Sequence, residues 1–105
     1  MNVISIAGRV SLATFAGLNV QQIRGLSFVV GRVSRSSVRL PAGPAVFVRY
    51  VEAPAGKRVV TRQYYLVHGG RLYIVTYTAL PAAEKADLAT FARSIDSLRL
   101  GTGTA

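Results

Sequence analysis

Residues of the types that carry out acid–base, nucleophilic or metal chemistry are few in this chain. It contains one histidine, His68, and no cysteine, and its four carboxylates are Glu52, Glu84, Asp87 and Asp96. A zinc site or a catalytic triad needs a histidine together with further ligands or with a nucleophile. The only closely spaced acids, Glu84 and Asp87, fit the solvated start of a helix. The chain also has no phosphate-loop pattern and no G-x-S-x-G motif. The sequence therefore predicts a protein that is not an enzyme, with no catalytic residue, no metal ligand and no cofactor.

The strongest local pattern lies in residues 58–78 and predicts a β-hairpin. Two runs rich in β-branched and aromatic residues, 58–68 and 71–78, flank the pair Gly69-Gly70. A two-residue primed turn needs positive φ at both central positions, which glycine adopts readily. Such a turn fixes the register, so that position 68 pairs with 71, 66 with 73, 64 with 75 and 62 with 77.

This register places tyrosines and arginines together on one face of the hairpin. The candidate contact surface consists of Arg62, Tyr64, Arg71, Tyr73 and Tyr77. Tyrosine and arginine are enriched at protein interfaces, and a similar mixture serves proteins that bind single-stranded nucleic acid. The alternative is that this face packs beneath a helix, with the hydroxyl and guanidinium groups reaching its rim.

The remaining patterns predict an α+β fold with the order β-α-β-β-β-β-α. Strands are expected at 2–7, 28–40 and 45–52, with a bulge at Gly31, and helices at 12–24 (capped by Ser11) and 82–97 (begun by Pro81). Short connections favour an antiparallel sheet of about five strands with the helices packed on it. The expected core consists of Phe15, Val46, Val48, Leu72, Ile74, Leu88, Phe91 and Ile95. We expect one domain, residues 1–100, and a disordered tail, residues 101–105.

The charge balance favours anionic partners. The 13 lysine and arginine side chains outnumber four acids, which gives a net charge of +9, and no carboxylate precedes Glu52. A basic nucleic-acid-binding domain would use Arg32, Arg35, Arg39, Arg49 and Arg62. Because the arginines occur singly and form no run, an arginine-rich codon bias is the favoured explanation of the composition.

A resemblance to a known superfamily rests on the hairpin and its neighbours. The hairpin reads Tyr64-Tyr65-x-x-x-Gly69-Gly70-Arg71-Leu72-Tyr73-x-Val75-Thr76-Tyr77-Thr78-Ala79, and the helix after it closes on Ser97-Leu98-Arg99-Leu100. Upstream stands the turn and strand Val38-Arg39-Leu40-Pro41-Ala42-Gly43-Pro44-Ala45-Val46. These segments resemble the PsbP/DcrB-like superfamily over residues 2–100. The resemblance implies a bacterial, non-enzymatic protein-binding or accessory module, in a superfamily whose members share a fold and not a function.

The chain departs from that superfamily at its start. Members usually begin with a further strand pair that carries a Pro-x-x-Trp-like segment, and envelope members have a lipoprotein signal before it, whereas this chain has no tryptophan. We therefore expect either a truncated gene start or a minimal version with an exposed sheet edge, most readily the strand at 2–7. The location expected is cytoplasmic as the chain is written, and envelope-associated if the start is truncated.

The partner expected from these features is a protein, including a second copy of the chain in a homo-oligomer, because an exposed edge tends to pair. Nucleic acid is an alternative partner, and a small ligand bound between sheet and helix is another. A transmembrane helix is not expected, since no stretch of about 18 residues is uniformly apolar.

Overall fold

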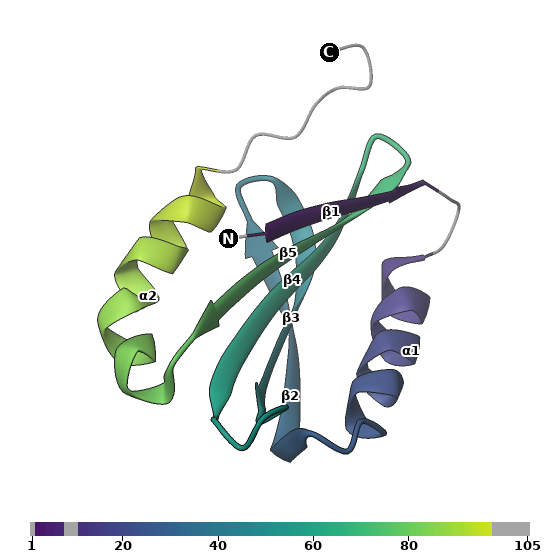
Figure 1. The fold of residues 1–105 in the computed structure, drawn as a ribbon. Helices are drawn as coiled ribbons and strands as arrows, with labels where there is room; N and C mark the ends of the chain where they lie inside the picture. The colour runs from purple at the N-terminus through teal and green to yellow at the C-terminus, as the bar shows by residue number, and fades with distance from the viewer. Residues whose placement is uncertain (1, 8–10, 98–105) are drawn as a thin grey trace.

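The computed structural model describes residues 2–7 and 11–97, which form a sheet with one helix on each face (Figure 1). The expected tail, residues 101–105, lies outside the described residues. The elements are β1 (Asn2–Ala7), α1 (Leu12–Arg24), β2 (Val29–Leu40), β3 (Gly43–Glu52), β4 (Val59–His68), β5 (Arg71–Ala79) and α2 (Pro81–Asp96).

All strand pairs in the sheet are antiparallel, and the spatial order is β1-β5-β4-β3-β2. This arrangement confirms the α+β class and the antiparallel sheet. It also places residues 2–7 at one edge, as expected, with β2 at the other edge. The hairpin register is confirmed, because His68 pairs with Arg71 and Leu66 with Tyr73. Gly69 and Gly70 have φ values of 58° and 76°, as a two-residue primed turn requires.

A bulge interrupts β2 where the sequence predicts one. Val30 pairs with Val51, but the next pair along is Ser34 with Arg49, so residues 31–33 lie opposite Tyr50 alone. Gly31 has φ of 79°, a conformation that residues with a Cβ rarely adopt. From Ser34 to Leu40 the pairing with β3 is regular.

The two helices bury opposite faces of the sheet. Helix α1 packs against β2, β3 and β4, and α2 packs against β5 and β4 (Figure 1). Successive side chains of a strand point to opposite faces, so adjacent residues on β4 pack in different cores. Tyr65 belongs to the core on the α1 side and Leu66 to the core on the α2 side. The core on the α1 side includes Ala16, Val20, Ile23, Val33, Val46, Val48, Tyr50 and Tyr65. The core on the α2 side includes Leu40, Ala45, Leu66, Val75, Tyr77 and Ile95.

Helix α1 is held more firmly than α2. Ser11 caps α1 by accepting a hydrogen bond from the Thr14 backbone N–H at 3.1 Å, and the helix buries three apolar side chains. Helix α2 begins with Pro81, has no side-chain cap, and fully buries only Ile95.

The predicted core is wrong at Leu88, which is 39% exposed. At 100° per residue, Glu84, Phe91 and Ile95 lie within about 20° of one direction on the helix, and Leu88 lies about 40° to one side. Leu88 therefore lies at the margin of the stripe that faces the sheet, whereas Glu84, at the centre of that stripe, contacts Arg49 and Arg62 on the sheet.

Gly17 provides a direct test of this description of α1. We expect Gly17→Ala to stabilise the protein by up to about 1 kcal/mol, because alanine forms helix better than glycine. The added Cβ would meet only Arg35 Nη1, at 3.8 Å, an ordinary contact. The matched change Gly69→Ala should destabilise the protein by about 1 kcal/mol or more, because Gly69 needs positive φ. Urea unfolding of both variants measures these changes, and a destabilised Gly17→Ala variant would contradict the packing of α1.

Candidate functional site

The five hairpin residues of the candidate contact surface all lie on the side of the sheet that α2 covers in part. Tyr77 is 2% exposed, and its ring centroid lies 4.7 Å from that of Phe91 on α2. This placement corrects the expectation for Tyr77, whose ring packs beneath the helix and is not available at a surface. The physical reason is that β5 lies directly under α2, so the side chains of β5 on this face are the first to be covered.

The other four residues of the set are more accessible. Tyr64 and Tyr73 are half-buried and pack against the core on the α2 side. Arg71 is exposed and donates a hydrogen bond from Nε to Ser5 Oγ at 2.6 Å, which links β5 to β1. Arg62 is half-buried and contacts Phe47 on β3 and Glu84 on α2.

Two aromatic rings and a guanidinium group pack together where β3 meets β4. Phe47 pairs with Tyr64, and their ring centroids are 5.0 Å apart, with the ring planes tilted by 42°. The Arg62 guanidinium lies over the Phe47 ring, with Cζ 4.7 Å from the centroid. Such a cation–π contact is worth about 0.5–1 kcal/mol at exposed sites. Phe47 is half-buried because α2 packs on β4 and β5 and does not cover this ring fully.

Phe47 and Arg49 were not among the residues that the sequence placed in the contact surface. The signal that could have found them is the alternation along β3, which puts 45, 47, 49 and 51 on one face. Which residues of β4 pair with Phe47 and Arg49 depends on the register between β3 and β4. The sequence does not fix this register, because the loop at residues 53–58 has no turn signature of fixed length. We use the term Phe47 surface for Phe47, Arg49, Arg62 and Tyr64.

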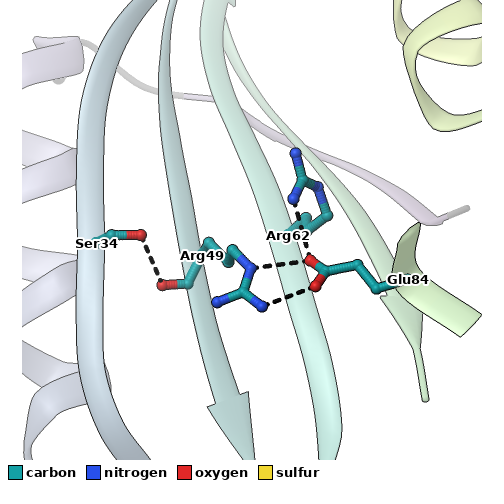
Figure 2. Close-up of polar contacts among 4 residues, drawn as sticks. All are labelled: Ser34, Arg49, Arg62 and Glu84. Atoms are coloured by element: carbon teal, nitrogen blue, oxygen red, sulfur yellow. Dashed lines mark hydrogen bonds and ion pairs between the residues drawn. The ribbon is translucent and has the colours of Figure 1, made fainter. Parts of the chain in front are cut away.

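Two arginines of the Phe47 surface share one carboxylate on α2 (Figure 2). Arg49 donates from Nε to Glu84 Oε2 at 2.8 Å and from Nη2 to Oε1 at 2.7 Å, and Arg62 donates from Nη1 to Oε2 at 3.1 Å. The Glu84 side chain is 14% exposed, against 37% for Arg49 and 19% for Arg62. The hydrogen bond from Arg49 is the largest cause that lowers the pKa of Glu84, and the hydrogen bond from Arg62 lowers it further, against an opposing effect of burial. The cluster fixes α2 against the sheet and keeps one positive charge in excess.

A second polar cluster ties α1 to the opposite face. Asn19 on α1 donates from Nδ2 to the Tyr65 hydroxyl at 2.6 Å, and that hydroxyl donates to Gln63 Oε1. Gln63 in turn donates to Thr76 Oγ1 at 3.4 Å. Tyr65 is fully buried, and burial is the main cause that raises the pKa of its hydroxyl to about 12. These contacts join α1 to β4 and β5 through buried or half-buried groups, so the cluster stabilises the fold.

The raised pKa of Tyr65 predicts alkaline sensitivity. Its ordinary pKa is 10.0 and its folded pKa is about 12, so above pH 10 the unfolded chain releases a proton that the folded chain retains. Stability is therefore fully present below pH 10 and falls as the pH rises toward 12. Unfolding free energies measured across this range, with tyrosinate absorbance, should show less of this loss in a Tyr65→Phe variant. An equal loss in the variant would contradict the assignment to Tyr65.

Within residues 2–7 and 11–97, no three His, Asp or Glu side chains gather as metal ligands would, and no pocket is present. Glu52 accepts a hydrogen bond from Thr61 at 2.7 Å, and His68 is half-buried beside the hairpin turn. No helix among the same residues is long and apolar enough to cross a membrane.

The arginines proposed for nucleic-acid binding do not form one surface. Arg49 and Arg62 lie on the α2 side with Glu84. Arg35 pairs with Val48, and Arg39 occupies the same face of β2 four residues further on, which is the α1 side. Arg32 lies within the bulge. The fold therefore distributes these charges over two faces and one edge.

Comparison with known proteins identifies the fold and leaves the family open. No family model matches the chain, and no curated protein matches it significantly. A crystal structure of PA94 from Pseudomonas aeruginosa, a protein of unknown function described as a candidate regulator, superposes with a TM-score of 0.81 at 16% sequence identity. The superposition covers 94% of this chain and 70% of PA94. At this identity the similarity concerns the fold alone.

Proposed function

We propose that this chain is a non-enzymatic protein-binding or accessory module of the PsbP/DcrB-like type, and that it contacts its partner through the Phe47 surface. The observation that carries the proposal is the packed group of Arg62, Phe47 and Tyr64, which remains half-buried beside α2. Tyrosine and arginine are enriched among the residues that dominate binding energy at protein interfaces. Aromatic side chains bury large areas with few rotatable bonds, and a guanidinium group offers several hydrogen-bond donors.

The ion cluster makes this surface suitable for binding. Glu84 holds both guanidinium groups by direct hydrogen bonds, and Arg62 is also fixed against the Phe47 ring. Side chains that are ordered before association lose less conformational entropy when a partner covers them. Arg49, 37% exposed, can still donate from its remaining nitrogen to a partner.

The two alternative functions find less support. A nucleic-acid site would need the basic side chains to follow one groove, whereas Arg49 and Arg62 lie on one face and Arg35 and Arg39 on the other. A small-ligand site between sheet and helix would need a pocket, and none is present among the described residues.

The test compares capture of partners by the parent and by a Phe47→Ala/Tyr64→Ala variant. Immobilised protein retains partners from a bacterial extract, quantitative mass spectrometry identifies them, and each identified partner is then purified and titrated directly. We expect the double variant to bind the purified partner with an affinity lower by about tenfold or more, because loss of an interface anchor has an effect of this size. Val67→Ala, on the same strand but facing the other side and 44% exposed, is the matched control.

Folding and partner class are checked in the same experiment. If the double variant shows a changed circular dichroism spectrum, it is misfolded and is replaced in the test by Phe47→Gln, which keeps most of the side-chain volume. Unaltered affinity in the surface variants would overturn the proposal. Binding of single-stranded DNA with a steep salt dependence, lost in the same variants, would favour the nucleic-acid alternative.

We also propose that the partners include a second copy of the chain, paired through β1. This strand lies at the edge of the sheet, and residues 2–7 contain no charged side chain that would oppose pairing. Light scattering after gel filtration should report a dimer, and Val3→Lys, at a position 41% exposed, should convert it to a monomer. A parent protein that is monomeric at every concentration tested would exclude self-pairing.

A further inference from the structure

We infer that the outer edge of β2 binds an extended acidic segment of another protein, which adds to the sheet as a further strand. β2 lies next to the strand that carries Phe47 and Arg49, but Arg35 and Arg39 point to the opposite face of the sheet from the Phe47 surface. The inference does not depend on the function proposed for that surface. It rests on three features of β2: the regularity of its edge, the charges along it, and the small side chains between them.

The edge is regular over seven residues. β2 is the last strand in the order β1-β5-β4-β3-β2. Its pairing with β3 is continuous from Ser34, opposite Arg49, to Leu40, opposite Gly43. The bulge bounds this segment on one side and the turn at Pro41 bounds it on the other. In an antiparallel ladder, alternate residues of an edge strand direct their N–H and C=O groups outward, so the segment presents a row of backbone donors and acceptors to an added strand.

The charges along this edge are positive only. Arg35 and Arg39 are exposed, lie on the same face of the strand, and have Ser37 between them. Among the described residues, neither guanidinium forms an ion pair, and no carboxylate occurs before Glu52. Arg35 Nη1 lies near α1, 3.8 Å from the position that a Cβ at Gly17 would occupy, so this guanidinium lies on the α1 face of β2.

Three small serine side chains beside the arginines leave the backbone of this edge accessible. Ser34, Ser36 and Ser37 are exposed and small, and residues 34–40 contain no proline or lysine, two of the residues that often block edge pairing. Arginine here discriminates between partners. It repels a second copy of the same strand by placing like charges side by side, and it attracts a strand with carboxylates at the facing positions.

The same features favour a peptide over nucleic acid. Residues 29–40 contain no aromatic side chain on which a base could stack. The backbone edge offers alternating donors and acceptors, which match another strand and not a phosphate chain. The predicted partner segment is about seven residues long with Asp or Glu at alternate positions, because side chains on one face of a strand recur every second residue.

The test uses a fluorescent seven-residue peptide, blocked at both ends, in which Glu and Val alternate. Binding to the full chain is measured by anisotropy. We expect Arg35→Glu/Arg39→Glu to weaken binding by about tenfold or more, through loss of the facing charges. Lys57→Glu/Arg58→Glu, which makes the same change in net charge at exposed loop positions, should change affinity by less than about twofold. Two further peptides serve as controls: one with the same composition but grouped Glu residues, and one with Lys in place of Glu.

Hydrogen exchange locates the bound peptide. We expect slower exchange of backbone amides within residues 34–40 and no change within residues 2–7. Each of three results would overturn the inference. The alternating peptide could fail to bind, the grouped peptide could bind as tightly as the alternating one, or Lys57→Glu/Arg58→Glu could weaken binding as much as Arg35→Glu/Arg39→Glu. Protection at β1 would also overturn it, as would binding of oligothymidine that depends on Arg35 and Arg39 while the peptide fails to bind. Unchanged melting temperatures of both double variants show that they are folded.

Discussion

Replacement of Leu66 by alanine should lower the free energy of unfolding by about 2–5 kcal/mol, the range for loss of a large aliphatic side chain from a packed core. Leu66 is fully buried on β4, the central strand, in the core on the α2 side. It pairs with Ala45 on β3 and with Tyr73 on β5, and the backbones of these hydrogen-bonded strands cannot move to fill the space. Thermal and urea unfolding measure the loss.

The adjacent residue provides the control for this change. Val67 follows Leu66 on the same strand but is 44% exposed, so Val67→Ala should change stability by less than about 0.5 kcal/mol. A comparable loss in both variants would mean that β4 is shifted by one residue, because such a shift exchanges the two faces of a strand.

Replacement of Glu84 by glutamine should lower the free energy of unfolding by about 1–3 kcal/mol, the range for hydrogen bonds to charged groups. The change leaves Arg49 and Arg62 without their shared carboxylate and weakens the attachment of α2. Asp87→Asn on the same helix is the control, since Asp87 forms no ion pair among the described residues. Equal effects of the two changes would argue against the cluster as the anchor of α2.

The same cluster predicts the direction of acid sensitivity. The pKa of Glu84 is lowered in the folded protein from the ordinary value of 4.5, first by the hydrogen bond from Arg49. The stabilisation is therefore present above about pH 4.5 and is lost as the pH falls through the lower folded pKa. Unfolding curves at a series of acidic pH values should show this loss in the parent and a flatter dependence in Glu84→Gln. A parallel decline in both proteins would assign the acid sensitivity to other carboxylates.

The sequence by itself determined the elements and one face of the hairpin. Gly69-Gly70 defined a two-residue turn, and the turn length fixed which residues pair, so the shared face of Arg62, Tyr64 and Tyr73 was predictable. Ser11 and Pro81 marked helix starts, and Gly31 marked the bulge in β2. These features are local, because a cap, a turn or a bulge depends on a few consecutive residues.

Only the tertiary structure decided what covers each face. The heptad-like pattern of α2 predicted Leu88 in the core, but the rotation of the helix on the sheet placed Glu84 there and left Leu88 exposed. Tyr77 became inaccessible because α2 lies over β5, and Phe47 stayed half-buried because the helix stops short of covering β3. The contacts between Glu84 and the two arginines join positions 35 and 22 residues apart. Hydrophobic periodicity predicts that a helix or strand has an apolar side. The direction in which that side points depends on packing between distant elements, which the local sequence does not encode.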